Sequence, residues 1–371
     1  MRVLVVNAGS SSLKLALLDG DDAILAGQEL HVAAGARIDE QALRRALACE
    51  LGDAEAIGHR IVHGGERYRS AVRIDPGVEA ALRELADLVP LHQPKSLAAL
   101  DAVTALLPDL PAVACFDTAF HASLPAAAAT YALPADWRER WKLRRYGFHG
   151  LSHAWVARRA PQLLGRSGLE LRIVSCHLGA GASLCAIDSG ESRDTTMGFT
   201  PLEGLVMATR SGSVDPGLLL WLMEHEGLSA PELAEALEHR SGLLGLSGTA
   251  DMRELLHRAD AGDRPAQLAL DVYLHRLRAE IAAMAAALGG LDALVFTGGV
   301  GEHSAVVREL AVAGLGFLGL AIDAERNGAA VADANISTPN ASAATLLITA
   351  REDREIARQV RAVMGREHQI G

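Results

Sequence analysis

Asn7-Ala-Gly-Ser-Ser-Ser-Leu-Lys14 is the most informative stretch of this chain. An apolar run, residues 3–6, leads directly into it and an alternating run, residues 13–18, leaves it, which predicts two strands joined by a tight turn. A glycine and serine turn points several backbone N–H groups and hydroxyls to one side, and such a nest binds anions, above all phosphate. Asn7 and Lys14 would add an amide and a cation. An ordinary serine-rich hairpin turn is the alternative that the stretch alone leaves open.

The same pattern returns near the middle of the chain. Residues 173–188 again have the pattern of a strand, a small-residue turn and a second strand that ends in Asp188. His177-Leu178-Gly179 stands where the first copy has Asn7-Ala8-Gly9. An internal duplication is more informative than either copy, because two such turns can hold one polyphosphate.

A third glycine cluster, residues 297–304, follows the apolar run 293–296. A helical pattern comes next, at residues 305–313, and Ser304 is a suitable N-cap for it. Three glycine-rich turns in order, each at the end of a strand, predict an α/β protein that binds phosphate groups.

Length and composition limit the possible functions. With 371 residues, half of them hydrophobic, the chain should form two domains with sizeable cores. The formal charge of −11 argues against nucleic-acid binding, which requires basic surface. An anionic substrate would therefore be met by local cations. Only three of the 35 basic residues are lysines, and Lys14 is one of them.

The cysteines and the apolar segments indicate the compartment. Cys49, Cys115, Cys176 and Cys185 show no C-x-x-C spacing, and Cys115 and Cys176 lie in apolar strand patterns. We expect free, buried thiols of a reducing compartment. The start of the chain has no secretory signal pattern, and the longest apolar helical run, residues 281–291, is too short to span a bilayer. We expect a soluble, cytoplasmic protein that does not bind membranes.

The order of these turns resembles the actin, hexokinase and Hsp70 superfamily, and further motifs resemble the acetate kinase family over nearly the whole chain. The motifs are residues 7–14 (NAGSSSLK), 59–65 (HRIVHGG), 90–94 (PLHQP), 116–121 (FDTAFH), 146–153 (YGFHGLSH), 177–183 (HLGAGAS), 197–204 (MGFTPLEG), 209–216 (TRSGSVDP) and 296–304 (FTGGVGEHS). Their number and order make chance agreement very improbable.

The resemblance implies an α/β fold of two duplicated actin-like (ribonuclease H-like) domains with a nucleotide cleft between them. Domain I would comprise residues 1–118 and 353–371, and domain II residues 119–352. The implied reaction is the reversible, direct in-line transfer of a phosphoryl group from ATP to acetate, which gives acetyl phosphate and ADP. It also implies Mg²⁺ as the cofactor and a homodimer.

Two arginines are the strongest candidates for catalysis. Arg60 ends the strand pattern 56–62, and Arg210 lies in a loop before a helix that Asp215 and Pro216 would start. A guanidinium offers a planar fork to a carboxylate or a phosphoryl group. A solvated loop arginine or a structural ion pair is the ordinary alternative. The resemblance implies that both hold the acetate carboxylate and the transferred phosphoryl oxygens.

Asp117 and His149 complete the expected catalytic set. Asp117 follows the apolar run 113–116, and the carboxyl end of a strand is where α/β sheets place functional groups. A helix cap or a turn residue is the alternative. By resemblance Asp117 would orient the arginines or the metal. It is not a general base, because a carboxylate nucleophile has no proton to lose. His149 would donate a hydrogen bond to the phosphoryl group, although a lone histidine is usually a core or loop residue.

The resemblance also implies the binding residues. The metal ligands would be Asn7 and Glu352. Alternatively, Glu352 is only an acidic residue that stabilises the first turn of a helix. The acyl pocket would comprise Val62, Leu91, Phe148 and Pro201 with Arg60 at the carboxylate, and His92 beside it. ATP would be bound by Ser10, Ser12, Lys14, His177, Leu178, Gly179, Ala180, Gly181, Asp251, Met252, Arg253, Gly299, Val300, Gly301 and Glu302.

The chain departs from the family pattern in four places. Ala180 stands where asparagine is usual, Met252 where an aromatic residue is frequent, and Ala350-Arg351 where threonine and asparagine are usual. The chain is also shorter around residues 23–42 and near its end. Ala180 and Ala350-Arg351 could weaken the binding of nucleotide or metal.

Two other functions remain open at this stage. A propionate or butyrate kinase would use the same chemistry with a larger acyl pocket. A nucleotide-gated binding protein of the same superfamily would use ATP to drive domain movement without acyl transfer. Such a protein would have no need of Arg60, Arg210 or an apolar pocket.

Overall fold

The chain forms two compact units. A computed structural model describes residues 1–9, 12–31, 39–49, 51, 53–85, 93–166 and 170–367. The first unit comprises Met1–Ala122, Phe148–Trp155 and Arg351–Gly371, and the second comprises Ser123–Gly147 and Val156–Ala350. The sequence assigned residues 148–155 to the second domain. They pack with the first unit because the N–H of Gly150 donates to the carbonyl of Asp117 at 2.9 Å.

The first unit is built on a six-stranded sheet with the order β3-β2-β1-β4-β6-β5. Its strands are β1 (Val3–Ala8), β2 (Ser12–Leu18), β3 (Ile24–His31), β4 (Ala56–Ile61), β5 (Val72–Arg73) and β6 (Ala112–Phe116). The expected hairpin is present: β1 pairs antiparallel with β2, and Asn7 lies opposite Lys14. Strands β1, β4 and β6 run parallel, so their carboxyl ends share one edge of the sheet.

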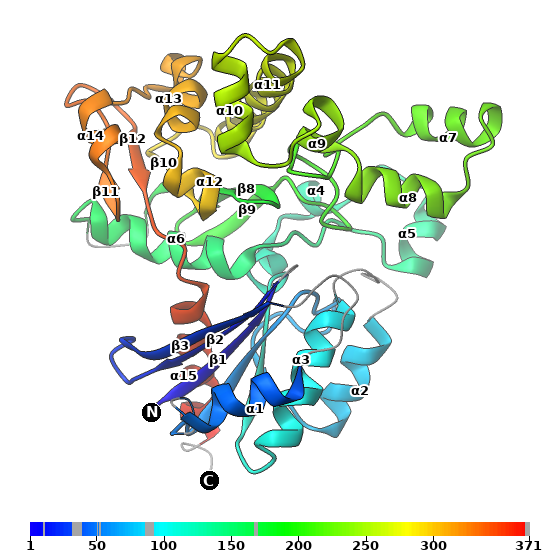
Figure 1. Cartoon of the computed structure of the whole chain (residues 1–371), viewed down its shortest axis with the longest axis vertical. Helices are drawn as coiled ribbons and strands as arrows, with labels where there is room; N and C mark the ends of the chain where they lie inside the picture. Colours follow the sequence, from blue (N-terminus) through cyan, green and yellow to red (C-terminus); the bar gives the residue numbers. More distant parts are fainter. Residues whose placement is uncertain are drawn as a thin grey trace. The chain divides into compact units, whose positions relative to one another are not determined.

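Helices cover both faces of this sheet (Figure 1). The helices of this unit are α1 (Glu40–Cys49), α2 (Pro76–Glu84), α3 (Gln93–Leu106), the 3₁₀ helix η2 (Ala119–Ser123), the start of α6 (Gly150–Leu163) and α15 (Glu352–Glu367). Leu4, Val6 and Ile57 pack with α1 and α3, whereas Val3 and Val5 on the other face pack with α15. Burial on both faces explains why these strands are apolar almost throughout.

The second unit repeats this topology. Its sheet has the order β11-β12-β10-β7-β8-β9. The strands are β7 (Arg172–Leu178), β8 (Ala182–Asp188), β9 (Glu191–Thr195), β10 (Ala293–Thr297), β11 (Ala334–Asn335) and β12 (Ala344–Leu347). As in the first unit, a hairpin is followed by parallel strands, here β7, β10 and β12. The internal duplication expected from the two turns is therefore present in the whole sheet.

The second unit carries most of the helices. They are α4 (Ala126–Ala129), α5 (Ala135–Trp141), the rest of α6, α7 (Pro216–His225), α8 (Ala230–His239), α9 (Gly242–Ser247), α10 (Met252–Asp260), α11 (Arg264–Ala287), α12 (Gly298–His303), α13 (Ala305–Ala313), η3 (Gly316–Leu318) and α14 (Ala324–Ala329). Helix α11 packs along β7, β8 and β9. Helices α5, α7 and α8 lie at one side of this unit (Figure 1).

Local expectations for the second unit mostly agree with the structure. Asp215 caps α7 and accepts a hydrogen bond from the N–H of Gly217, and Ser304 caps α13. The third glycine cluster differs from the open turn expected, because residues 298–303 form the short helix α12. No helix among the described residues is long and apolar enough to cross a membrane.

Candidate active site

A buried ion pair lies at the carboxyl edge of the first sheet. Arg60 on β4 donates from Nη2 to Oδ2 of Asp117 at 2.6 Å, and its Nε lies 3.1 Å from both carboxylate oxygens. The side chains are 14% and 1% exposed. Asp117 follows β6 directly, and β4 and β6 are parallel neighbours, which brings these residues together. A buried charge requires such a partner.

Asn7 and Glu352 extend this pair into a cluster. Arg60 Nη1 donates to Oδ1 of Asn7 at 3.2 Å, and Nδ2 of Asn7 donates to Oε2 of Glu352 at 2.9 Å. Asn7 lies near the end of β1, and Glu352 opens α15. The structure thus brings together four of the residues that the sequence singled out, from three strands and one helix.

Burial and charge act against each other in this cluster. Burial raises the pKa of the Asp117 carboxyl, and the Arg60 guanidinium opposes that rise. For Arg60, burial disfavours the charged form, but the carboxylates of Asp117 and Glu352 outweigh it and raise the pKa of Arg60. The carboxylates of Asp117 and Glu352 thus both stabilise the charged form of the Arg60 guanidinium.

Gly150, the residue after His149, packs directly against Asp117. A Cβ on Gly150 would lie 2.0 Å from the carbonyl oxygen of Asp117, so only glycine permits this close approach. His149 itself has a φ of 56°, a left-handed conformation that is uncommon for residues other than glycine. This unusual backbone is consistent with a functional position for the imidazole.

Two of the expected pocket residues lie in the first unit. Val62 and Phe148 are both buried, and the ring of Phe148 packs edge-on against His63, the neighbour of Val62, at 5.7 Å between centroids. His121 Nε2 contacts the carbonyl of Phe148 at 3.0 Å. His63 and His121 are therefore buried supports of this region. Leu91, like His92, lies outside the described residues.

The first turn is described only in part. The N–H of Gly9 donates to the carbonyl of Ser12 at 2.8 Å, which closes the turn. Ser12 is nearly buried, and Ser10 lies outside the described residues. Lys14 is exposed and faces Glu29 on the next strand at 3.9 Å. The Lys14 ammonium group therefore lies beside the Glu29 carboxylate.

The second turn is closed in the same way. Gly179 donates to the carbonyl of Gly181 at 3.0 Å, and the strands on either side pair up to Leu178 and Ala182. His177 pairs with Ser183 across the hairpin, and the residue between the two glycines, Ala180, is exposed.

The third glycine segment packs directly on the second turn. A Cβ on Gly298 would lie 2.9 to 3.1 Å from backbone atoms of Leu178. Glu302, expected at the nucleotide, accepts through Oε1 from the N–H groups of Gly298 and Ala350, both at 2.9 Å. Its carboxylate therefore fixes the segment that also presents Gly299, Val300 and Gly301.

Arg210 lies in a loop that touches the same turn. The N–H of Ala208 donates to the carbonyl of Ala180 at 3.1 Å. The Arg210 guanidinium lies 2.8 Å, Nε to Oε2, from the nearly buried carboxylate of Glu238 on α8. Its Nη1 donates to the carbonyl of Pro201, the pocket residue that lies in the second unit, at 3.4 Å.

The remaining expected nucleotide residues have local contacts at the start of α10. Asp251 caps this helix and pairs with Arg253 at 2.7 Å, and this hydrogen bond lowers the pKa of Asp251 to about 2. The Arg253 side chain is 91% exposed, so this pair contributes little to stability. Met252 is buried in the second unit.

Sequence reasoning missed the residues that hold the loops of the second unit. Glu203 lies 2.5 Å from the Tyr131 hydroxyl and 2.7 Å from Arg145, and the three fix the loop that contains Pro201. Buried Arg308 donates to the carbonyls of Gly301 and Glu302 at 2.9 and 2.7 Å. Glu203 lies in the motif 197–204 but had no role assigned to it, and no motif marks Tyr131, Arg145 or Arg308.

Comparisons with known proteins agree with this arrangement. The sequence model of the Acetokinase family matches residues 25–358. The chain is 45% identical to an acetate kinase of Gloeobacter violaceus, over 97% of this chain and 98% of that protein. Among solved structures, it resembles an acetate kinase of Porphyromonas gingivalis (TM-score 0.89, 36% identity, 98% and 99% coverage). It also resembles a propionate kinase of Francisella tularensis (TM-score 0.89, 34% identity, 96% and 98% coverage).

Proposed function

Because the chain belongs to the Acetokinase family, we propose that it transfers a phosphoryl group from ATP to acetate, reversibly, giving acetyl phosphate and ADP. The observation that carries this proposal is the buried cluster of Arg60, Asp117, Asn7 and Glu352 at the carboxyl edge of the first sheet. A nucleotide-gated binding protein would not need a buried guanidinium there.

The residues have separate roles in this proposal. Arg60 binds the acetate carboxylate, and Asp117 holds the plane of its guanidinium through the 2.6 Å contact. Val62 and Phe148, with Leu91 and Pro201, enclose the methyl group. Arg210 and His149 stabilise charge on the phosphoryl oxygens, since catalysis of this transfer depends mainly on positioning and charge neutralisation.

Nucleotide binding is assigned to the glycine-rich segments. The backbone N–H groups of both turns and the side chains of Ser10, Ser12, Lys14 and His177 bind the phosphates. The segment of Gly299, Val300, Gly301 and Glu302 and the start of α10, Asp251 to Arg253, border the adenosine. The closeness of Gly298 to Leu178 supports a joint role for the second turn and the third segment.

The donor set in the first unit fits Mg²⁺. Asn7 and Glu352, in direct contact at 2.9 Å, offer oxygen ligands, which this hard cation prefers. Mg²⁺ would supply charge neutralisation on the phosphates. The described residues hold no group of three or more histidine, cysteine or acidic side chains placed for a metal, so water and phosphate would complete the coordination.

Trapping of the product tests the function. The purified protein is incubated with Mg²⁺, ATP and acetate in hydroxylamine, which converts an acyl phosphate into a coloured hydroxamate. We expect hydroxamate that depends on all three components and is lost with a chelator. ADP formation without hydroxamate would contradict acyl transfer and favour a nucleotide-gated binding protein.

Propionate is the second candidate substrate, because a solved propionate kinase is as similar in fold as the acetate kinase. One methylene in an apolar pocket is worth about 1–3 kcal/mol, so propionate should react more weakly than acetate and butyrate poorly. Val62→Ala should move the preference toward propionate. A higher kcat/KM for butyrate than for acetate would contradict the assignment to acetate.

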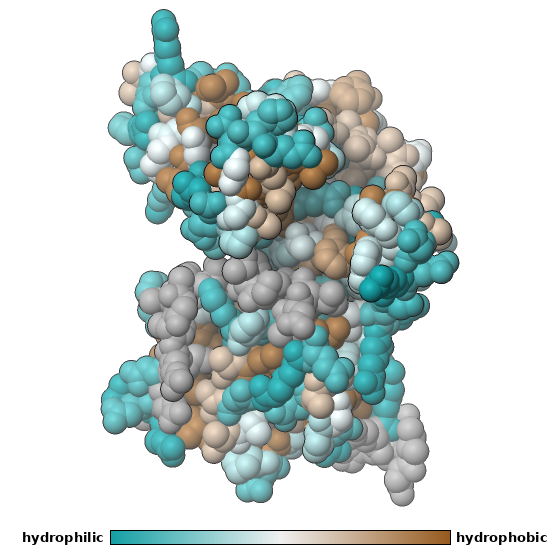
Figure 2. Space-filling model, turned by 90° about the vertical axis from the view of Figure 1, so that its right-hand side faces the viewer, coloured by the Kyte–Doolittle hydropathy of each residue, from teal (hydrophilic) through white to brown (hydrophobic). Residues whose placement is uncertain are grey.

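We also propose a homodimer and a reducing, cytoplasmic location. Helix α7, fully described, has no buried residue although its sequence is largely apolar. Three of the four tryptophans, Trp137, Trp141 and Trp221, are each 47% exposed. Figure 2 shows the molecule from the side on which α7 lies, and hydrophobic residues are visible on the surface of the second unit. Cys115, Cys176 and Cys185 are buried and form no disulfide with one another, which supports the location.

A further inference from the structure

The loop that carries Arg210 is held by one end of a neighbouring helix. Thr209 donates through its hydroxyl to the carbonyl of Glu238 at 2.8 Å. The N–H of Ser211 donates to the carbonyl of Leu237 at 3.0 Å. Both residues that flank Arg210 are therefore bonded to the last turn of α8, which fixes the backbone but not the guanidinium.

The side chain of Glu238 contacts the guanidinium itself. Its Oε2 lies 2.8 Å from Arg210 Nε, and the carboxylate is 9% exposed. Within the part of the chain that the structure describes, Oε2 accepts no aligned hydrogen bond, so the contact is an ion pair at close distance. A nearly buried carboxylate that depends on one guanidinium constrains where that guanidinium can lie.

Each of the two candidate catalytic arginines thus has a buried or nearly buried carboxylate beside its guanidinium, hydrogen-bonded for Arg60 and ion-paired for Arg210. Arg60 is held by the buried carboxylate of Asp117 at 2.6 Å, and Arg210 by that of Glu238 at 2.8 Å. A long arginine side chain has many rotamers, and a fixed partner removes that freedom before the substrate arrives. On the proposed function, Arg210 acts on an anionic oxygen, so its orientation affects the rate.

We propose that Glu238 is a positioning residue for phosphoryl transfer, whose carboxylate holds the Arg210 guanidinium in the orientation that meets the substrate oxygens. Glu238 does not touch the substrate. The inference rests on the proposed function of Arg210, and it extends that function to a residue on α8 that no motif marks.

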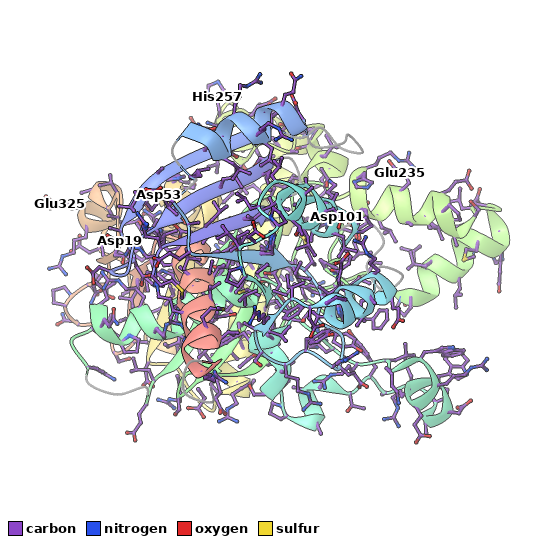
Figure 3. All side chains as sticks on the ribbon, turned by 90° about the horizontal axis from the view of Figure 1, so that it is seen from below. Asp19, Asp53, Asp101, Glu235, His257 and Glu325 are labelled. Carbon is purple, nitrogen blue, oxygen red and sulfur yellow. The ribbon has the colours of Figure 1, made fainter. Side chains whose placement is uncertain are left out.

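The test compares two isosteric changes on the same helix. Glu238→Gln removes the charge from the pair, and Glu235→Gln is the matched control. Glu235, labelled in Figure 3, is 60% exposed and lies 3.9 Å from His239. We expect Glu238→Gln to lower kcat/KM for acetate by roughly 10- to 100-fold, with KM for ATP changed by less than about twofold, and Glu235→Gln to match the wild type. Thermal unfolding of each variant reports whether the fold is intact.

A double-mutant cycle separates positioning from a structural role. In an Arg210→Ala background, adding Glu238→Gln should cause no further loss of kcat/KM, because the residue acts through Arg210. An equal loss in both backgrounds, or normal kinetics of Glu238→Gln beside an impaired Arg210→Ala, would overturn the positioning role alone. A wild-type protein that forms no hydroxamate would overturn the proposed function, and this inference with it.

Discussion

At the scale of single residues, the first unit depends on a charge pair that is costly to bury and costlier to break. The Asp117 side chain is almost fully buried, and that of Arg60 is mostly buried. Removing one partner leaves the other as an uncompensated buried charge. Changing Arg60 alone, or together with Asp117, therefore separates the contribution of this pair to stability from its proposed contribution to catalysis.

Arg60→Ala should lower kcat by roughly 10²-fold, because one electrostatic donor to the transition state is lost. It should also lower the free energy of unfolding by about 3–5 kcal/mol, because the Asp117 carboxylate is left buried and unpaired. Steady-state kinetics and urea unfolding measure the two effects. The double variant Arg60→Ala with Asp117→Asn should regain stability but not activity. Recovery of activity would show that Arg60 is structural.

Arg210→Ala should lower kcat by roughly 10²-fold for the same reason. The second turn, 177–181, is closed by its own backbone bond from Gly179 to Gly181 and does not need the arginine side chain. Binding of ATP, measured by calorimetry, should therefore change little. Normal turnover of this variant would make Arg210 a structural residue.

Ala180→Asn tests the departure in the second turn. The position is exposed, so a larger side chain fits, and asparagine tolerates turn geometry well. Its amide could donate to a nucleotide phosphate, and a hydrogen bond to a charged group is worth about 1.5–3 kcal/mol. We expect tighter binding of ADP·Mg²⁺ in calorimetric titration, by about tenfold, with little change in KM for acetate. Equal affinities would mean that another group already supplies the donor.

At the scale of elements, β4 fixes the position of α15. A Cβ on Gly58 would lie 2.5 Å from Cγ2 of Ile356 and 2.7 Å from Cγ2 of Val360, so the helix rests directly on the strand. Glu352 opens this helix and contacts Asn7. The approach of helix to strand therefore determines the geometry of the proposed metal ligands.

Gly58→Ala should destabilise the protein by about 1–3 kcal/mol, because the added methyl group overpacks the contact between β4 and α15. It should also weaken Mn²⁺ binding, measured by electron paramagnetic resonance, because Glu352 moves with the helix. Gly365→Ala is the control: it lies on α15 with nothing within 4 Å of its Cβ and should stabilise by about 0.5–1 kcal/mol. Equal stability of the two variants would contradict this account of the packing.

Two buried histidines make the stability of this region dependent on pH. Burial lowers the pKa of His59 on β4, and of His63 after it, from 6.5 to about 4. Between these values the unfolded chain binds protons that the folded chain does not, so stability is complete above pH 6.5 and falls toward pH 4. We expect a loss of about 2 kcal/mol per histidine at pH 5. His59→Leu should roughly halve this loss in urea unfolding at pH 7 and pH 5, and an unchanged loss would refute it.

At the scale of the whole molecule, an apolar side of the second unit remains to be covered. Leu218, Leu220, Trp221 and Met223 on α7 are between 41% and 60% exposed. Helix α5, which carries the exposed Trp137 and Trp141, lies at the same side of the unit (Figure 1). Exposed apolar groups of this extent mark association surfaces.

Leu220→Glu should convert the proposed dimer to a monomer, because a charge at the centre of an apolar interface would be buried without a partner. Sedimentation velocity of the wild type and the variant measures this. Phe317→Glu is the control, since Phe317 is 74% exposed and lies on η3, outside the α5 and α7 side. A monomeric wild type, or a dimer that persists in Leu220→Glu, would contradict the proposal.

Local patterns were sufficient to predict much of this architecture. The hairpins at 7–14 and 173–188 and the caps Asp215 and Ser304 depend on neighbouring residues, so their signals are present in short segments. Two such hairpins indicated an internal duplication, whereas the actin-like fold was implied by the resemblance to a family. The roles assigned to the site residues also came from that resemblance.

Contacts between distant segments could be found only in the tertiary structure. Glu238 looks like an ordinary charged residue in the sequence, yet it pairs with Arg210 in a functional loop, and Glu203 is bonded to the distant Tyr131. Glu302 fixes a backbone segment through its carboxylate. A side chain that is polar in sequence becomes buried and paired only when the sheet, its helices and their loops come together, because burial and pairing depend on residues that the chain brings near by folding.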